Sequence, residues 1–167
     1  VGPSMLRYAH ARAEALGKAV HFSQQNAERT TFEDRSFDLI VSHIMMHEMP
    51  PDAVRNVLRE SRRLLRPGGL MVHAYAGQYA AMDLYRQFIY DSEVYNNNEP
   101  YWSTCRDLDL VALAEEAGFA EGEAWMDLEP FRPHSLSSPE LDKSRTGRKD
   151  LQSNVLGMHL LVGRRPS

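Results

Sequence analysis

The sequence has few of the features that distinguish secreted, membrane-spanning or nucleic-acid-binding proteins. Its 167 residues include one cysteine, Cys105, which excludes an internal disulfide framework. No apolar stretch reaches the roughly 18 residues needed to cross a bilayer, so no membrane partner is expected. The net charge of −4 and the scattering of basic residues argue against a nucleic-acid partner. We therefore expect a cytoplasmic protein.

Two further absences concern the start of the chain and its glycines. The sequence begins at Val1 without an initiator methionine, so we expect a fragment. It contains no glycine-rich turn of the kind that opens a nucleotide site, because the glycines of Pro67-Gly68-Gly69 are expected to end a helix.

What the sequence does contain is an alternation of helical and strand patterns. Apolar residues recur at helical spacing in three segments, residues 3–16, 51–66 and 107–117. Alternating or continuous short apolar runs predict strands over residues 19–24, 37–42, 70–75, 120–128 and 154–165. The alternation indicates an α/β fold with a mostly parallel sheet, and the last two strands indicate a C-terminal antiparallel hairpin.

The length favours a single domain over residues 1–167, with two stretches that interrupt the alternation. The segment from about residue 77 to 106 is rich in aromatic side chains and is predicted to form a cap insertion. It includes an expected helix from Tyr79 to about Asp91. Residues of about 130–153 are rich in serine, proline and charge, and are predicted to form a mobile loop.

Several consecutive motifs carry a family resemblance. They read PSMLRYA, QQNAE, FEDRSFDLIVSHIMMHEMP, RESRRLLRPGGLMVH and EEAGF, and together they run from Pro3 to Phe119. In this order and spacing they resemble class I S-adenosylmethionine-dependent methyltransferases, in particular the branch that acts on small molecules. The resemblance implies a Rossmann-like methyltransferase fold, S-adenosyl-L-methionine as the cofactor and a small-molecule acceptor as the partner.

The resemblance also implies residues for the cofactor site. The cofactor of the family lies across the carboxyl ends of the parallel strands, where Ser42 is expected. Asn26 and Ala27 match the adenine-binding positions of the family, and Met5 matches a position that packs on the adenine. Asn26 departs from the acidic side chain of the family, although its amide oxygen can still accept a hydrogen bond from the adenine amino group.

The family's first strand, its glycine-rich loop and its ribose-binding acidic residue would all precede Val1. We therefore expect an N-terminally truncated domain. In the family's strand order, 3-2-1-4-5-7-6, the strand that ends at Ser42 would neighbour the missing first strand, so its edge should be exposed and apolar. On its own, the chain is expected to bind S-adenosylmethionine weakly or not at all.

His43 and His47 follow the strand that ends at Ser42 and are the candidate catalytic residues. Methyl transfer needs a general base only where the acceptor starts protonated, and histidine titrates in the useful range. The alternative is that either histidine packs and bonds to the backbone. A metal site of His43, His47 and Glu48 would need a helix, which Pro50-Pro51 opposes, so no metal is expected.

Tyr95, Tyr101 and Trp102 are the candidate substrate-binding residues, because aromatic rings in a cap can stack on a substrate. Ordinary packing within the cap is the alternative. The arginines 59, 62, 63 and 66 are interpreted as a solvated helix face.

Two alternative functions stay open beside methyl transfer. One is a non-catalytic Rossmann-like interaction module, which the asparagine at position 26 favours slightly. The other is an NAD(P)-type dinucleotide-binding domain, although the sequence has no Tyr-x-x-x-Lys pair. No motif encodes the acceptor atom or the oligomeric state.

Overall fold

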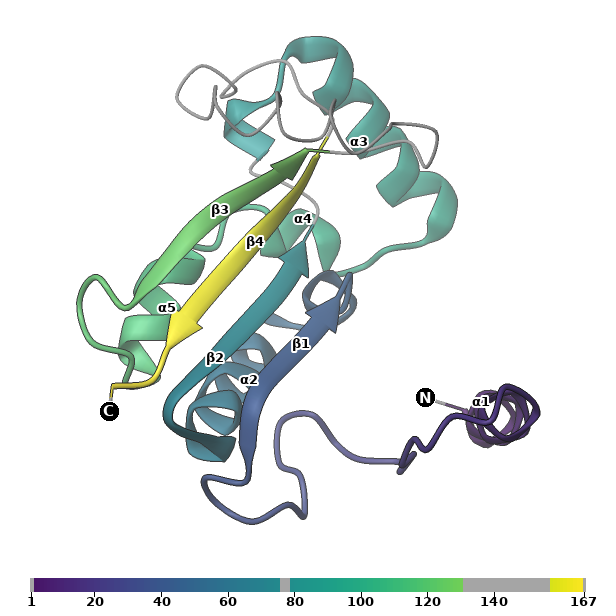
Figure 1. Cartoon of the computed structure of the whole chain (residues 1–167). Coiled ribbons are helices and arrows are strands. Elements are labelled where there is room, and N and C mark those ends of the chain that lie inside the picture. Colours follow the sequence, from purple (N-terminus) through teal and green to yellow (C-terminus); the bar gives the residue numbers. More distant parts are fainter. Residues whose placement is uncertain (1, 76–78, 131–156, 167) are drawn as a thin grey trace, which may run out of the picture.

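The computed structural model describes residues 2–75, 79–130 and 157–166 of the chain. Four strands form one mixed sheet in the order β1-β2-β4-β3. Their bounds are Phe37–His43 for β1, Leu65–Tyr75 for β2, Ala124–Pro130 for β3 and Gly157–Arg164 for β4. Figure 1 shows the sheet with helices α2 (Pro51–Leu64) and α5 (Leu110–Glu116) behind it.

The strand directions confirm the α/β fold and the C-terminal hairpin. β1 and β2 are parallel, whereas β4 is antiparallel to both β2 and β3. Three of the four described strands, β1, β2 and β3, therefore point the same way, and β4 is inserted between β2 and β3. This order corresponds to the 4-5-7-6 half of the sheet expected from the sequence.

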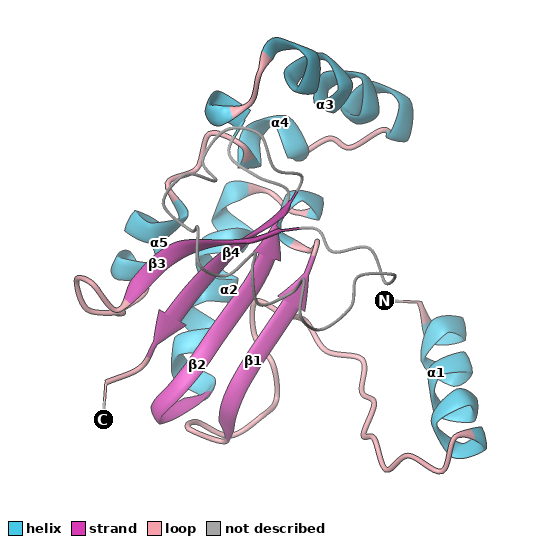
Figure 2. Cartoon of the chain, turned by 45° about the horizontal axis from the view of Figure 1, so that its top comes forward, coloured by secondary structure: helices cyan, strands magenta, loops and turns pink. Residues whose placement is uncertain are grey.

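One face of the sheet carries the hydrophobic core. Helices α2 (Pro51–Leu64) and α5 (Leu110–Glu116) cover this face, as both views show (Figures 1 and 2). Apolar side chains of α2, α5 and the strands meet there, and the most completely buried are Val54, Leu58, Leu65, Met71 and Leu161. Burial of this apolar surface is the main force that holds the layers together.

The opposite face carries no helix among the described residues (Figure 2). Leu39 and Val41 point to this face and are 54% and 62% exposed. β1 is also an edge strand, since its described neighbour is β2 alone. The expected exposed, apolar edge at this strand is therefore confirmed in the described part of the chain.

The N-terminal segment contains one correct prediction and one wrong one. Helix α1 (Pro3–Ala15) forms with Pro3 at its first turn, but it stands apart from the sheet and buries none of its residues (Figure 1). Residues 19–24 are irregular instead of a strand. A strand needs a neighbouring strand, and none of the described strands pairs with this segment; Val20 accordingly is 49% exposed.

The junction between α2 and β2 also differs from the prediction. The helix ends at Leu64, and Leu65 is already extended, with φ −68° and ψ 137°. Pro67, Gly68 and Gly69 lie inside β2, where the pairing with β1 is irregular, and not at a helix end. Arg165 stabilises the junction because its guanidinium donates to the carbonyl oxygens of Arg62 and Leu65 at 3.0 and 2.7 Å.

Four further helical elements follow β1 or β2 in the chain. They are the 3-10 turns η1 (Met46–Glu48) and η2 (Tyr79–Ala81) and the helices α3 (Leu84–Asn97) and α4 (Trp102–Cys105). Asp83 caps α3 by accepting from the Arg86 amide, and Asn98 ends the helix in the left-handed region, with φ 54°. α3 and α4 fall within the predicted cap insertion.

Residues 131–153 of the predicted mobile loop lie outside the described part of the chain. Among the described helices, none combines the length and apolar character needed to span a membrane.

Candidate active site

A pocket of about 320 Å³ runs along the unpaired edge of β1. Its walls come from β1, from α2, and from the loop that precedes β1, which contributes Ala27, Thr30 and Phe32. The lining is mostly apolar, with a few polar side chains from Ser42, Ser61, Glu60, Thr30 and His73. An apolar pocket with a small number of placed polar groups is the usual composition of a small-molecule site.

Ser42 and His73 form a partly buried hydrogen bond in the lining of this pocket. Ser42 is at the carboxyl end of β1 and pairs with His73 of β2, so the two side chains share a face of the sheet. The Ser42 hydroxyl and His73 Nδ1 are 2.6 Å apart, and His73 Nε2 is 3.4 Å from the Ser61 hydroxyl of α2. Burial lowers the pKa of His73 to about 4, so the ring is neutral at physiological pH.

Glu60 fixes the loop that forms the other wall. Its carboxylate accepts from the Thr30 amide at 2.8 Å and from the Thr30 hydroxyl at 2.6 Å, and it also pairs with Arg63. The hydrogen bond from Arg63 is the largest effect on Glu60 and lowers its pKa to about 2. Arg63 in turn pairs with Asp34 and donates to the Phe32 carbonyl oxygen at 2.9 Å.

The four predicted cofactor-binding residues do not all meet. Ala27 and Ser42 line the same pocket. Asn26 adjoins Ala27, and its amide oxygen accepts from the Glu28 amide at 3.0 Å, which leaves a second lone pair available. Met5 is on the detached helix α1, 64% exposed, and does not line this pocket (Figure 1).

The exit from β1 is sharply bent. Ile44, directly after His43, has a φ of 50°, which is rare for a β-branched residue and costs on the order of 1–2 kcal/mol. Its amide donates to the Ala74 carbonyl oxygen at 2.9 Å, so the bend is held by β2. His43 itself is exposed and lies on the same face as Leu39 and Val41. Strained backbone of this kind is concentrated at functional sites.

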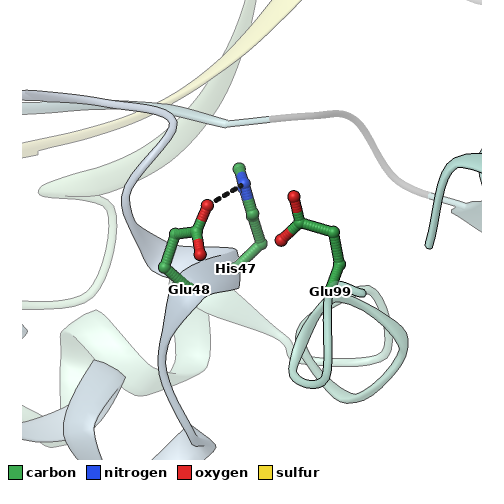
Figure 3. A group of neighbouring side chains, drawn as sticks. All are labelled: His47, Glu48 and Glu99. Carbon is green, nitrogen blue, oxygen red and sulfur yellow. Dashed lines mark ion pairs between the residues drawn. The ribbon is translucent and has the colours of Figure 1, made fainter. Parts of the chain in front are cut away.

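His47 lies beyond the bend, in η1, and is buried. Its ring stacks on that of Trp102 of α4, with 4.6 Å between the centroids and an interplanar angle of 21°. His47 Nε2 is 3.4 Å from a carboxylate oxygen of Glu48, while its Nδ1 is buried and has no hydrogen-bond partner among the described residues. Figure 3 shows the ring between the carboxylates of Glu48 and Glu99, which follows α3. The expectation that no helix joins His43 and His47 ahead of Pro50-Pro51 is confirmed, because His43 ends β1 and only Met46–Glu48 form a 3-10 turn.

The three predicted substrate-binding residues have different environments. Tyr95 is 87% exposed and Tyr101 is 37% exposed, whereas Trp102 is buried against His47 and Tyr90. The structure therefore brings Trp102 and His47 together. It leaves Tyr95 on the surface of α3.

Several residues of the site were missed in the sequence. His73 and Glu60 occupy an apolar strand and an amphipathic helix, where a single polar residue gives no distinctive signal. The spacing of Glu60 and Arg63 by three residues was available as evidence of a helical ion pair. The interpretation of the arginines in and after α2 as a solvated helix face holds only in part, because Arg63 of α2 pairs with Asp34, and Arg66 lies in β2 and pairs with Asp38.

Comparisons with known proteins find methyltransferases similar in sequence to this chain. Residues 1–69 match a family described as a methyltransferase domain. Over 71 residues the chain is 38% identical to a ubiquinone/menaquinone biosynthesis C-methyltransferase of Nitrobacter hamburgensis, covering 41% of this chain and 27% of that protein. Over 122 residues it is 30% identical to an uncharacterized methyltransferase of Synechocystis, covering 65% of this chain and 53% of that protein. The chain thus spans about a quarter of the first relative and about half of the second.

A solved structure shows the same fold. An S-adenosylmethionine-dependent methyltransferase of Methanosarcina mazei superposes with a TM-score of 0.63 at 18% identity, covering 99% of this chain and 79% of that one. The predicted resemblance to this family and its Rossmann-like fold are both confirmed.

Proposed function

Because the chain is related to S-adenosylmethionine-dependent methyltransferases, we propose that it serves the transfer of a methyl group from S-adenosylmethionine to a small-molecule acceptor. The observation that carries the proposal is the position of Ala27 and Ser42. Both match cofactor-binding positions of the family, they are 15 residues apart in sequence, and they line one pocket at the edge of β1.

The pocket has the chemistry that a nucleoside needs. Its apolar walls, from residues such as Phe32, Leu39 and Ile40, suit a flat base, and the Ala27 segment offers backbone groups for its polar edge. Asn26 supplies an uncharged acceptor beside them. Ser42, held by His73, presents a fixed hydroxyl toward the carboxyl end of the sheet.

We assign the acceptor side to the region beyond the β1 bend. The sulfonium is already activated, so catalysis depends mainly on alignment of the acceptor and exclusion of water. His43 is the better candidate for a general base because it is exposed next to Ser42, whereas His47 is buried under Trp102. Tyr101, which is 37% exposed and directly precedes Trp102, is the candidate for contact with the acceptor, and Tyr95 on α3 is 87% exposed.

A binding experiment on the full-length gene product that contains these residues tests the proposal. Isothermal titration should show that S-adenosylhomocysteine binds and that NADH does not. Ala27→Leu should weaken the binding of S-adenosylhomocysteine by at least about tenfold, because the larger side chain would fill part of the pocket of about 320 Å³. Ala11→Leu on exposed α1 is the matched control and should bind like wild type.

Two results would overturn the proposal. One is binding of NADH in preference to S-adenosylhomocysteine, which would indicate a dinucleotide-binding domain. The other is normal S-adenosylhomocysteine affinity in Ala27→Leu, which would place the cofactor elsewhere. Binding without methyl transfer to any of a panel of small hydroxy, amino and thiol compounds would favour the non-catalytic module.

A further inference from the structure

We propose that His47, Glu48 and Glu99 bind a divalent transition-metal ion of the zinc type. Their donor atoms all lie within 4.8 Å of one another, although the residues come from two separate segments of the chain. His47 and Glu48 belong to η1, and Glu99 follows the left-handed residue Asn98 that ends α3. Figure 3 shows the two carboxylates on either side of the imidazole.

The spacing of the donors fits a shared metal better than a direct hydrogen bond. His47 Nε2 and the Glu48 carboxylate oxygen are 3.4 Å apart. A charge-assisted hydrogen bond between these groups would be about 2.7–2.9 Å long. In a tetrahedral zinc site with bonds of about 2.0–2.2 Å, neighbouring donor atoms lie roughly 3.3–3.6 Å apart. Glu99 reaches the same geometry through a shift of its side chain by about 1 Å, which a partly exposed glutamate allows.

Packing sets the direction of the imidazole ring. The His47 side chain is only 3% exposed and is stacked on Trp102. Its Nε2 faces the Glu48 carboxylate at 3.4 Å, whereas Nδ1 is buried and has no partner among the described residues. A ring that stacking orients toward two carboxylates is preorganised for a cation.

Charge favours a cation at the same place. Among the described residues, no arginine or lysine forms an ion pair with Glu48 or Glu99, and Glu48 pairs with His47 alone. A divalent ion would neutralise two carboxylates that otherwise repel each other. The nitrogen donor favours zinc, cobalt or nickel over magnesium and calcium, which prefer oxygen donors.

Exposure indicates an open coordination sphere. The Glu48 side chain is 59% exposed and Glu99 is partly exposed, so water or an acceptor group can reach the remaining positions. Three protein ligands with an open fourth position are typical of catalytic rather than structural zinc sites. The ion would also join η1, at the exit of β1, to the α3–α4 turn that carries Tyr101. This inference does not depend on the methyl-transfer proposal.

Direct metal binding by the full chain tests the inference. Competition against a chromophoric chelator should show one equivalent of zinc, and cobalt should give the visible absorption of a four-coordinate complex. Glu99→Gln and Glu48→Gln should each lower the affinity for zinc by at least about tenfold. Loss of a residue that binds the ion directly should cost at least as much affinity as loss of a residue that only orients a ligand. The control is Glu93→Gln, an exposed glutamate on the same helix α3, which should bind zinc like wild type.

His47→Gln should also lose zinc, and circular dichroism of this variant shows whether it remains folded. The glutamate variants keep the test valid if it does not, because they leave the His47–Trp102 stack in place. Absence of zinc binding by the wild-type chain would overturn the inference. So would unchanged affinity and cobalt spectrum in both Glu48→Gln and Glu99→Gln, because the ion would then be held elsewhere.

Discussion

His73 is the residue whose proton affinity changes most clearly through burial. Its side chain is enclosed between β2 and α2, and its pKa falls from 6.5 to about 4. The two nitrogens of the neutral ring face the hydroxyl groups of Ser42 and Ser61, so one nitrogen can donate a hydrogen bond and the other can accept one. The same burial that orders Ser42 for the proposed cofactor site therefore makes the fold sensitive to acid.

The sign of this effect follows from proton linkage. Above pH 6.5 the ring is neutral in both the folded and the unfolded state, so it adds no pH dependence. Between pH 6.5 and 4 the unfolded chain takes up a proton that the folded chain does not, and stability falls as pH falls. The expected loss in free energy of unfolding from pH 7 to pH 5 is about 2 kcal/mol.

His73→Asn should remove most of this loss while keeping a polar partner for Ser42. Urea denaturation at pH 7 and pH 5 measures the free energy of unfolding. The change between the two pH values is compared with that of the wild type, because the variant is also expected to be less stable at both. The exposed His21→Asn is the control and should retain the wild-type difference. An undiminished pH 7 to pH 5 loss in His73→Asn would show that another group titrates.

At the scale of elements, the junction of α2 and β2 leaves no room for a side chain at Gly69. A Cβ on Gly69 would lie 2.9 Å from the Arg66 carbonyl oxygen and 3.2 Å from that of Asp38. Both are backbone atoms, one within β2 and one from β1, so neither can turn away as a side chain could. The Gly69 carbonyl oxygen also accepts from the Arg165 amide at 3.0 Å, which fixes the end of β4.

Gly69→Ala should therefore lower the free energy of unfolding by about 1–3 kcal/mol, since overpacked positions respond by backbone shifts. Chemical denaturation at neutral pH measures the change. Gly2→Ala is the matched substitution, because a Cβ there meets nothing within 4 Å, and its effect should stay within about 0.5 kcal/mol. Equal stability of the two variants would show that the β1–β2 junction relaxes easily.

This junction also illustrates what the sequence could and could not predict. Helical periodicity located α2 and α5, and the run FDLIVS located β1, because these signals are local. Pro67-Gly68-Gly69 has the composition of a helix end, but Leu65 and Leu70 on either side of it pair with β1, and Gly68 and Gly69 bond to the backbone of Arg165. The strand predicted over residues 19–24 was wrong for the opposite reason. The alternation of these residues is a strand pattern, but a strand forms only beside another strand.

The site was predictable to the extent that its residues belong to recognisable segments. Ala27 and Ser42 could be found from the motifs around them, and the structure places both on one pocket. Glu99 could not, since it approaches His47 only through the turn that ends α3. Contacts between distant segments depend on the packing of α3 and α4, which no single sequence motif encodes.

At the scale of the whole molecule, the described chain has a sheet with one covered and one open face. The exposed β1 edge, together with Leu39 and Val41, presents unpaired backbone groups beside apolar side chains. Such edges are templates for pairing with another strand. We expect the 167-residue chain to self-associate as its concentration rises.

Leu39→Lys should reduce this association, because a charged side chain on an edge strand opposes pairing. Light scattering or sedimentation over a concentration series measures it. Leu84→Lys provides a matched control, since Leu84 is 84% exposed on α3, away from the sheet edge, and its replacement should leave association unchanged. A monomeric wild-type chain, or equal effects of the two substitutions, would contradict the expectation.

The stacking of His47 on Trp102 gives the protein an optical reporter of its own. The chain has two tryptophans, and Trp125 lies on β3, 38% exposed, so Trp125→Phe would leave Trp102 as the one indole that emits. Its fluorescence would then respond to any event that rotates, protonates or coordinates the neighbouring imidazole. Titrations of ligands at the exit of β1 could be followed in this way without an added dye.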